Sequence, residues 1–191
     1  MPEVSAMAGH CRTRAAVVIM TRNRRNELLR TLRRLERLPD QDEIIVVDND
    51  SSDDTADAVR WTFPHVRLIS VDRNLGAVAR TVGARAASYP IVAFSDDDSW
   101  WAPGSLARAA WHFDRHTDLA LICARIIVEP HGTVDRACLK MGAAPLGRGA
   151  DLPGPRILGH LACGTIVRRA AYLQAGGYSE LIRFGGEELL L

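Results

Sequence analysis

Short apolar runs alternate with stretches of helical periodicity along most of the sequence, and this alternation restricts the possible folds more than any other feature. Continuous runs rich in Val and Ile at residues 15–20 and 43–48 have the pattern of strands buried on both faces. Between them, leucines recur at helical spacing until Pro39. Strands and helices that alternate every roughly 20 to 25 residues predict right-handed crossovers, and hence an α/β fold whose mostly parallel central sheet is flanked by helices.

The alternation continues to residue 116, and the rest of the chain is less regular. Further strands are predicted at 66–71 and 91–94, and further helices at 55–61, 76–88 and 104–116. Beyond these, the pattern predicts a strand at 119–128, an irregular insertion rich in Gly and Pro at 130–155, and a last strand at 162–167.

Composition excludes several classes of protein. The chain has 24 Lys and Arg against 23 Asp and Glu, and 47% of its residues are hydrophobic, which argues against disorder and against a dedicated nucleic-acid binder. Its longest apolar runs are about a third of the roughly 20 residues that span a bilayer, so no transmembrane segment is expected. Without a secretory signal in its first residues, the chain is expected in the cytoplasm.

Polar side chains gather directly after three of the predicted strands, at residues 21–24, 48–50 and 96–98. Ligands of open α/β sheets bind beyond the carboxyl ends of the strands, so these clusters are expected along one edge. Three successive aspartates repel one another, and Mg²⁺ or Mn²⁺ shared with substrate phosphates would relieve that repulsion. The alternative is a helix cap and turn before Trp100.

These clusters belong to an ordered series of motifs that resembles the family 2 glycosyltransferases of GT-A fold. The series runs Thr21-Arg-Asn-Arg24, Val47-Asp-Asn-Asp-Ser-Ser-Asp-Asp-Thr55, Asn74-Leu-Gly76 with Arg80, Ser95-Asp-Asp-Asp98, Gly176-Gly-Tyr-Ser-Glu180 and Gly186-Glu-Glu188. Thr81 departs from the asparagine that the family has after the arginine. The resemblance implies a single GT-A-like domain over residues 15–191, preceded by a flexible segment at 1–14 and lacking the acceptor-side C-terminal part.

The resemblance also assigns roles to individual residues. Asp98 would bind Mn²⁺ or Mg²⁺, Asp96 the ribose or the metal through water, and Asp97 the donor sugar or a phosphate. The other residues that the resemblance places at the nucleotide sugar are Thr21, Asn23, Arg24, Asp48, Asn49, Asp50, Asn74, Gly76 and Arg80.

A carboxylate is needed to take the proton from the attacking acceptor hydroxyl. Glu188 is the first candidate and Glu187 the second, although two acids at a helix start can also interact only with the helix dipole.

The function expected from these motifs is metal-dependent, inverting transfer of a sugar from a nucleoside diphosphate sugar to an acceptor hydroxyl. UDP, GDP and dTDP donors and lipid-linked, polysaccharide or small-molecule acceptors all remain open, and nucleic acid is not expected as a partner. Association with the inner membrane face is compatible with a lipid-linked acceptor. The alternative is a truncated, non-catalytic domain that binds a nucleotide sugar.

Overall fold

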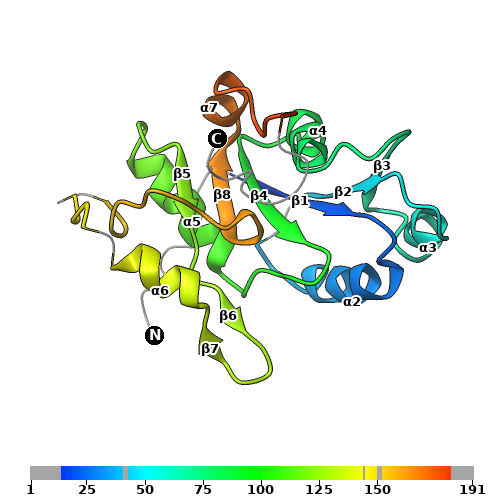
Figure 1. Cartoon of the computed structure of the whole chain (residues 1–191), viewed down its shortest axis with the longest axis horizontal. Helices are drawn as coiled ribbons and strands as arrows, with labels where there is room; N and C mark the ends of the chain where they lie inside the picture. Colours follow the sequence, from blue (N-terminus) through cyan, green and yellow to red (C-terminus); the bar gives the residue numbers. More distant parts are fainter. Residues whose placement is uncertain (1–13, 41–42, 144, 150–151, 182–191) are drawn as a thin grey trace.

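The computed structural model describes residues 14–40, 43–143, 145–149 and 152–181, and it has the α/β architecture that the sequence predicts (Figure 1). Within these residues, a six-stranded sheet has the strand order β3-β2-β1-β4-β8-β5. The first four strands in this order are parallel, whereas β8 is antiparallel to both of its neighbours. The strands are β1 (Ala15–Thr21), β2 (Glu43–Asn49), β3 (Arg67–Val71), β4 (Ile91–Asp96), β5 (Leu121–Cys123) and β8 (Thr165–Arg168).

Helices cover both faces of the sheet. The first layer holds α2 (Arg25–Leu35), α3 (Thr55–Thr62) and α5 (Ser105–Arg115), and the second holds α4 (Val78–Ala86) and α7 (Arg169–Gln174). Side chains of β1 alternate between the two layers, with Val17 and Ile19 in the first core and Ala16 and Val18 in the second. All four are 0% exposed, which confirms a strand buried on both faces.

The close approach of α4 to β1 depends on a glycine in the helix. A Cβ atom at Gly83 would overlap Val18 and would lie 3.1 Å from Cγ2 of Val47. The missing side chain therefore lets the backbone of α4 lie directly on β1 and β2.

The predictions for the second half of the chain are partly wrong. The strand predicted at 119–128 is two strands in two sheets, because β5 ends at Cys123 and β6 (Ile127–Val128) pairs with β7 (Thr133–Val134). The insertion predicted to be irregular contains β7 and α6 (Arg136–Gly142), whose N-cap Asp135 accepts a hydrogen bond from the Ala137 amide. A run of apolar residues does not indicate where a strand leaves its sheet. In the insertion, the high Gly and Pro content predicted irregular structure even though Asp135 can cap a helix.

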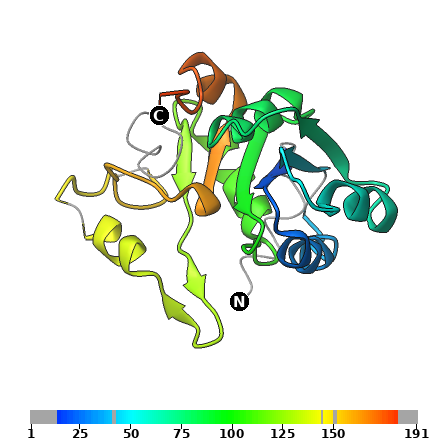
Figure 2. The ribbon, with the colours of Figure 1, turned by 45° about the vertical axis from the view of Figure 1, so that its right-hand side comes forward.

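The other strand predicted in this half, 162–167, begins as the 3₁₀ turn η1 (Ala162–Gly164) and becomes β8 only at Thr165. Residues 125–143, which we call the arm, extend away from the sheet (Figure 2). Ile127 and Val128 are 51% and 44% exposed, and no residue of α6 is buried. The arm therefore contributes little to either core.

Some predictions about the ends of the chain lie outside the described residues. These are most of the flexible segment predicted at 1–14 and the helix start that carries Glu187 and Glu188. Among the residues that the structure describes, no helix combines the length and apolar character needed to cross a membrane.

Candidate functional site

The carboxyl ends of β1, β2 and β4 lie side by side at one edge of the sheet. In the strand registers, Thr21 is opposite Asp48 and Met20 is opposite Asp96. The loops that follow the three strands meet at this edge, where open α/β sheets bind ligands. We call it the aspartate edge and define it by Thr21, Arg24, Asp48 and residues 96–98.

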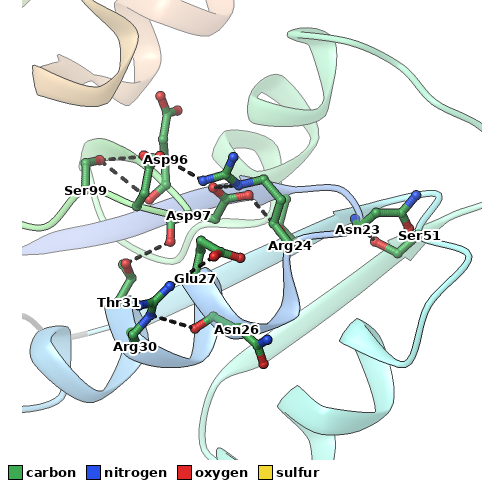
Figure 3. Close-up of polar contacts among 12 residues, drawn as sticks. Asn23, Arg24, Asn26, Glu27, Arg30, Thr31, Ser51, Asp96, Asp97 and Ser99 are labelled. Atoms are coloured by element: carbon green, nitrogen blue, oxygen red, sulfur yellow. Dashed lines mark hydrogen bonds and ion pairs between the residues drawn. The ribbon is translucent and has the colours of Figure 1, made fainter.

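Asp97 is turned inward at the aspartate edge and is only 7% exposed. Its carboxylate accepts a hydrogen bond from Thr21 Oγ1 at 3.0 Å and pairs with Arg24 Nε at 2.8 Å. Its main-chain oxygen accepts a bond from Thr31 Oγ1 (Figure 3). Burial raises the pKa of Asp97 to about 6, while the Thr21 and Arg24 contacts act in the opposite direction. Asp97 thus joins β1 and α2 to the loop after β4, and its contact with a sugar or phosphate stays a prediction.

Asp96 and Asp98 have more accessible carboxylates, each paired with an arginine. The side chain of Asp96 is 37% exposed and lies 2.6 Å from Nη2 of Arg80, while that of Asp98 is 61% exposed and lies 2.9 Å from Nη2 of Arg24. The charged carboxylates beside Arg24 raise its pKa, with Asp97 making the largest contribution. Two arginines therefore compensate part of the repulsion among the three aspartates, and one negative charge is left over when all three are ionised.

The donor set fits a metal ion shared with a substrate better than a dedicated metal site. Among the described residues, no group of three or more His, Cys, Asp or Glu side chains is arranged to hold a metal. Asp96 and Asp98 nevertheless present carboxylate oxygens at the same edge. A Mg²⁺ or Mn²⁺ ion held mainly by substrate phosphates needs only one or two such ligands.

Asp48, at the end of β2, has an unusual environment for a carboxylate. The residue is 4% exposed, and its Oδ1 is buried without a hydrogen-bond partner among the described residues. Buried polar atoms are normally paired, because leaving one unpaired costs free energy. An N–H donor from a ligand in the adjoining loops would satisfy this oxygen.

The loops after β1 and β2 are joined through Asn23. Its Oδ1 accepts a bond from the Ser52 amide at 2.7 Å, and its own amide donates to Ser51 Oγ at 2.9 Å. Asn23 and Asp50 both have left-handed backbones, with φ of 54° and 64°. Residues in this sparsely populated region often mark ligand-binding loops, since surrounding contacts must hold them there.

The predicted residues Asn49, Asn74 and Gly76 form a network that holds the loop before α4. Nδ2 of Asn49 donates to Asn74 Oδ1 at 2.9 Å, and the Leu75 amide donates to Asn49 Oδ1 at 2.8 Å. Asn74 Oδ1 also accepts from the Gly76 amide, and Gly76 has a left-handed φ of 57°. These residues are brought together as expected, and their observed contacts fix the loop that leads to Arg80.

A buried polar cluster that the sequence motifs do not predict lies next to Arg80. Thr81 Oγ1 lies 2.7 Å from the Tyr172 hydroxyl and accepts a bond from the Tyr178 amide at 3.1 Å. The Tyr178 ring centre is 5.8 Å from the Arg80 guanidinium carbon, and its hydroxyl lies 3.2 Å from His160 Nε2. Part of the signal for this cluster was present, because Thr81 occupies a motif position where this sequence departs from the family pattern and Tyr178 lies in the Gly176-Gly-Tyr-Ser-Glu180 motif.

Comparison of sequences relates the chain to glycosyltransferases. The sequence model described as glycosyl transferase family 2 matches residues 16–174. The chain is 26% identical over 193 residues to the succinoglycan biosynthesis protein ExoU of Rhizobium meliloti (strain 1021), covering 91% of this chain and 54% of that protein. It is 43% identical over 88 residues to the validoxylamine A glucosyltransferase of Streptomyces hygroscopicus subsp. limoneus, covering 42% of this chain and 19% of that protein.

Comparison of structures supports the fold. S. aureus TarS 1-349 in complex with UDP-GlcNAc superposes with a TM-score of 0.72 at 21% identity, covering 93% of this chain and 52% of that one. The mannosyltransferase PcManGT from Pyrobaculum calidifontis, in complex with GDP-Man and Mn²⁺, superposes with a TM-score of 0.69 at 19% identity. The match covers 98% of this chain and 55% of that one. The fold is therefore GT-A, as the motifs predict, and the chain spans about half the length of these proteins.

Proposed function

The chain belongs to glycosyl transferase family 2, and we propose that it binds a nucleoside diphosphate sugar at the aspartate edge and transfers the sugar to an acceptor hydroxyl with inversion. The observation that carries this proposal is Oδ1 of Asp48, which is buried at the end of β2 and has no hydrogen-bond partner among the residues that the structure describes. A nucleobase N–H would pair with this oxygen. Thr21, Asn23, Arg24 and Asp50 would form the walls around the nucleoside.

The diphosphate would lie toward Arg80 and the exposed carboxylates. We propose that Asp98, together with Asp96, holds Mn²⁺ or Mg²⁺; when bound, this ion neutralises charge that develops on the departing diphosphate. Arg80 supplies a second positive charge there, and its ion pair with Asp96 orients its guanidinium. Asp97 keeps Arg24 in place beside Asp98.

The proton of the acceptor hydroxyl would be taken by Glu188, with Glu187 as the alternative; both lie outside the described residues. The donors UDP, GDP and dTDP remain candidates for the nucleotide part, and UDP-GlcNAc and GDP-Man are bound by two proteins of similar fold. We propose a lipid-linked or polysaccharide acceptor and a cytoplasmic site of action, at the inner membrane face if the acceptor is lipid-linked.

Calorimetric titration of the purified chain with UDP, GDP and dTDP tests the binding site, each measured with Mn²⁺ and with EDTA. We expect one nucleotide to bind, and only with Mn²⁺. Asp98→Ala should weaken this binding about tenfold or more, because one charged ligand contributes roughly 1.5 to 3 kcal/mol. The matched control is Asp118→Ala, at an exposed position on the chain segment after α5, which should bind as the wild type does.

Each contrary result has a defined meaning. A folded chain that binds none of the three nucleotides would contradict the proposed donor site. Unchanged Mn²⁺-dependent binding by Asp98→Ala would contradict the metal assignment alone. Tight binding of the nucleotide sugar without hydrolysis or transfer would favour the alternative function, a non-catalytic nucleotide-sugar-binding domain.

A further inference from the structure

A basic groove lies between α2 and the loop after β4, next to the aspartate edge. Its volume is about 390 Å³, and its walls include four arginines and an aromatic ring, Arg30, Arg33, Arg34, Arg37 and Trp100. Two carboxylates, Glu27 and Asp98, also line the groove, and they are paired with Arg30 and Arg24. Arg30 and Arg33 also line an adjoining concavity of about 520 Å³ along α2. The groove therefore combines a concave shape with an excess of positive charge.

The four arginines form a stripe along one side of α2 and the turn that follows it. Their spacing of three, four and seven residues places them on neighbouring positions of the same helix face. Like charges at these spacings destabilise a helix. The dipole of α2 favours cations near its last turn, but it does not account for a groove with an aromatic wall beside them. The stripe is thus not explained by the stability of the helix.

The ion pairs in the groove leave part of this charge uncompensated. Arg30 pairs with Glu27 at 2.9 Å (Figure 3), and Arg34 pairs with Glu129 of the arm at 3.2 Å. Within the described part of the chain, the exposed side chains of Arg33 and Arg37 have no carboxylate partner. Two guanidinium groups are therefore available to an anion that enters the groove.

Trp100 fixes the direction of a third guanidinium. The guanidinium carbon of Arg34 lies 3.6 Å from the Trp100 ring centre, which is close stacking of a cation on an aromatic face. A stacked guanidinium keeps its N–H groups directed outward in its plane, and it loses less rotational freedom when it binds a ligand. Arg34 is thus held in place at the side of the groove.

We propose that this groove is a binding site for phosphoryl groups, adjoining the nucleotide-sugar site at Asp98, with Arg33, Arg34 and Arg37 as its ligands. Guanidinium groups donate paired hydrogen bonds that match the oxygens of a phosphate. A phosphorylated small molecule and a phospholipid headgroup offer this same chemistry. The site goes beyond the proposed glycosyl transfer and does not depend on it.

The test uses the purified chain in EDTA without nucleotide, and it presents phosphate in two forms. Inorganic pyrophosphate is titrated by calorimetry, and phosphatidylcholine vesicles with or without phosphatidylglycerol are assayed by flotation. Arg33→Gln/Arg37→Gln is compared with Arg85→Gln/Arg136→Gln, which removes two exposed arginines from α4 and α6. Arg80→Gln reports any pyrophosphate bound at the aspartate edge. Titration with UDP, GDP and dTDP in Mn²⁺ checks the nucleotide site separately.

We expect the groove variant to lose about tenfold or more in binding, as two charge-assisted contacts are removed, while the Arg85→Gln/Arg136→Gln control binds as the wild type does. Nucleotide binding should be unchanged in the groove variant. Loss of pyrophosphate binding identifies a soluble phosphorylated ligand, and loss of binding only to phosphatidylglycerol vesicles identifies a lipid headgroup. No binding to either form, an equal loss in the Arg85→Gln/Arg136→Gln control, or a loss only in Arg80→Gln would overturn the proposal.

Discussion

The aspartate edge and the arm are built in opposite ways, although both carry polar residues near the same groove. The edge lies on β1, β2 and β4, whose central residues are fully buried, and its loops are joined by side-chain bonds such as that between Asn49 and Asn74. The arm packs no residue of α6 into a core, and a surface ion pair between Arg34 and Glu129 links it to α2. Side chains at the edge are therefore held by the sheet, whereas those of the arm are held mainly by local contacts.

This difference has a consequence for how the two regions respond to change. Regions with few buried apolar contacts open at lower free energy than the core of the same protein. The arm should therefore tolerate substitution, and its local opening should leave the aspartate edge intact. Paired substitutions of the same kind, one in each region, can test this contrast.

The largest difference is expected for leucine truncation. Leu32→Ala removes a side chain of α2 that is 0% exposed, and should lower the free energy of unfolding by about 2 to 5 kcal/mol. Leu139→Ala in α6, where the leucine is 59% exposed, should change it by no more than about 0.5 kcal/mol. Urea unfolding monitored by circular dichroism measures both. Equal losses in the two variants would show that the arm is part of the core.

A smaller difference is expected when a glycine of each region gains one methyl group. Gly83→Ala places its Cβ against Val18 and should destabilise the protein by about 1 to 3 kcal/mol, because the core around α4 cannot easily move apart. Gly142→Ala meets nothing within 4 Å and should be neutral or stabilise by up to about 1 kcal/mol through helix propensity. Thermal and urea unfolding check the sign of each change, and a stable Gly83→Ala protein would contradict the close packing of α4.

The pH dependence of stability should reveal the buried carboxyl of the aspartate edge. Burial raises the pKa of Asp97 from 3.8 to about 6. Between pH values of about 4 and 6, the Asp97 carboxyl is therefore still protonated in the folded chain but has lost its proton in the unfolded chain. The Asp97 contribution to the free energy of unfolding should therefore fall as pH rises from about 4 to 6.

Asp97→Asn removes this titration. Urea unfolding in EDTA across the same pH range should show wild-type stability declining relative to the Asp97→Asn variant. The exposed control Asp118→Asn should follow the wild-type profile. A wild-type protein that gained stability relative to Asp97→Asn over this range would show that the Arg24 pair, rather than burial, dominates at Asp97.

The smallest effect is expected at the contact between the two regions. Glu129→Gln removes the partner of Arg34, and an exposed ion pair of this kind contributes no more than about 1 kcal/mol to stability. The variant should unfold almost as the wild type does. Since it frees Arg34, it should also bind pyrophosphate somewhat more tightly in the same titration, and weaker binding would argue against a role for Arg34 in the groove.

Much of the fold could be predicted because its signals are local. The buried strands at β1, β2 and β4 and the leucine-rich α2 follow from apolar periodicity, which needs only neighbouring residues. Parallel strand direction places three polar segments on one edge of the sheet, residues 21–24, 48–50 and 96–98. Predictions failed where an outcome depended on distant partners. β5 ends at Cys123, where its pairing with β8 ends, and no local pattern within residues 119–128 indicates this strand end.

The sequence alone thus determined the α/β class, the family motifs and the edge at which the polar residues meet. These features follow from the hydrophobic pattern and from the succession of strands and motifs along the chain. Tertiary structure decided what each of those residues touches. In the folded chain, the carboxylate of Asp97 is buried against Thr21 and Arg24. Asp96 forms an ion pair with Arg80, and the guanidinium of Arg34 stacks on Trp100. These pairings join residues separated by 16 to 76 positions. They depend on packing directions and burial, which exist only once the helices lie on the sheet.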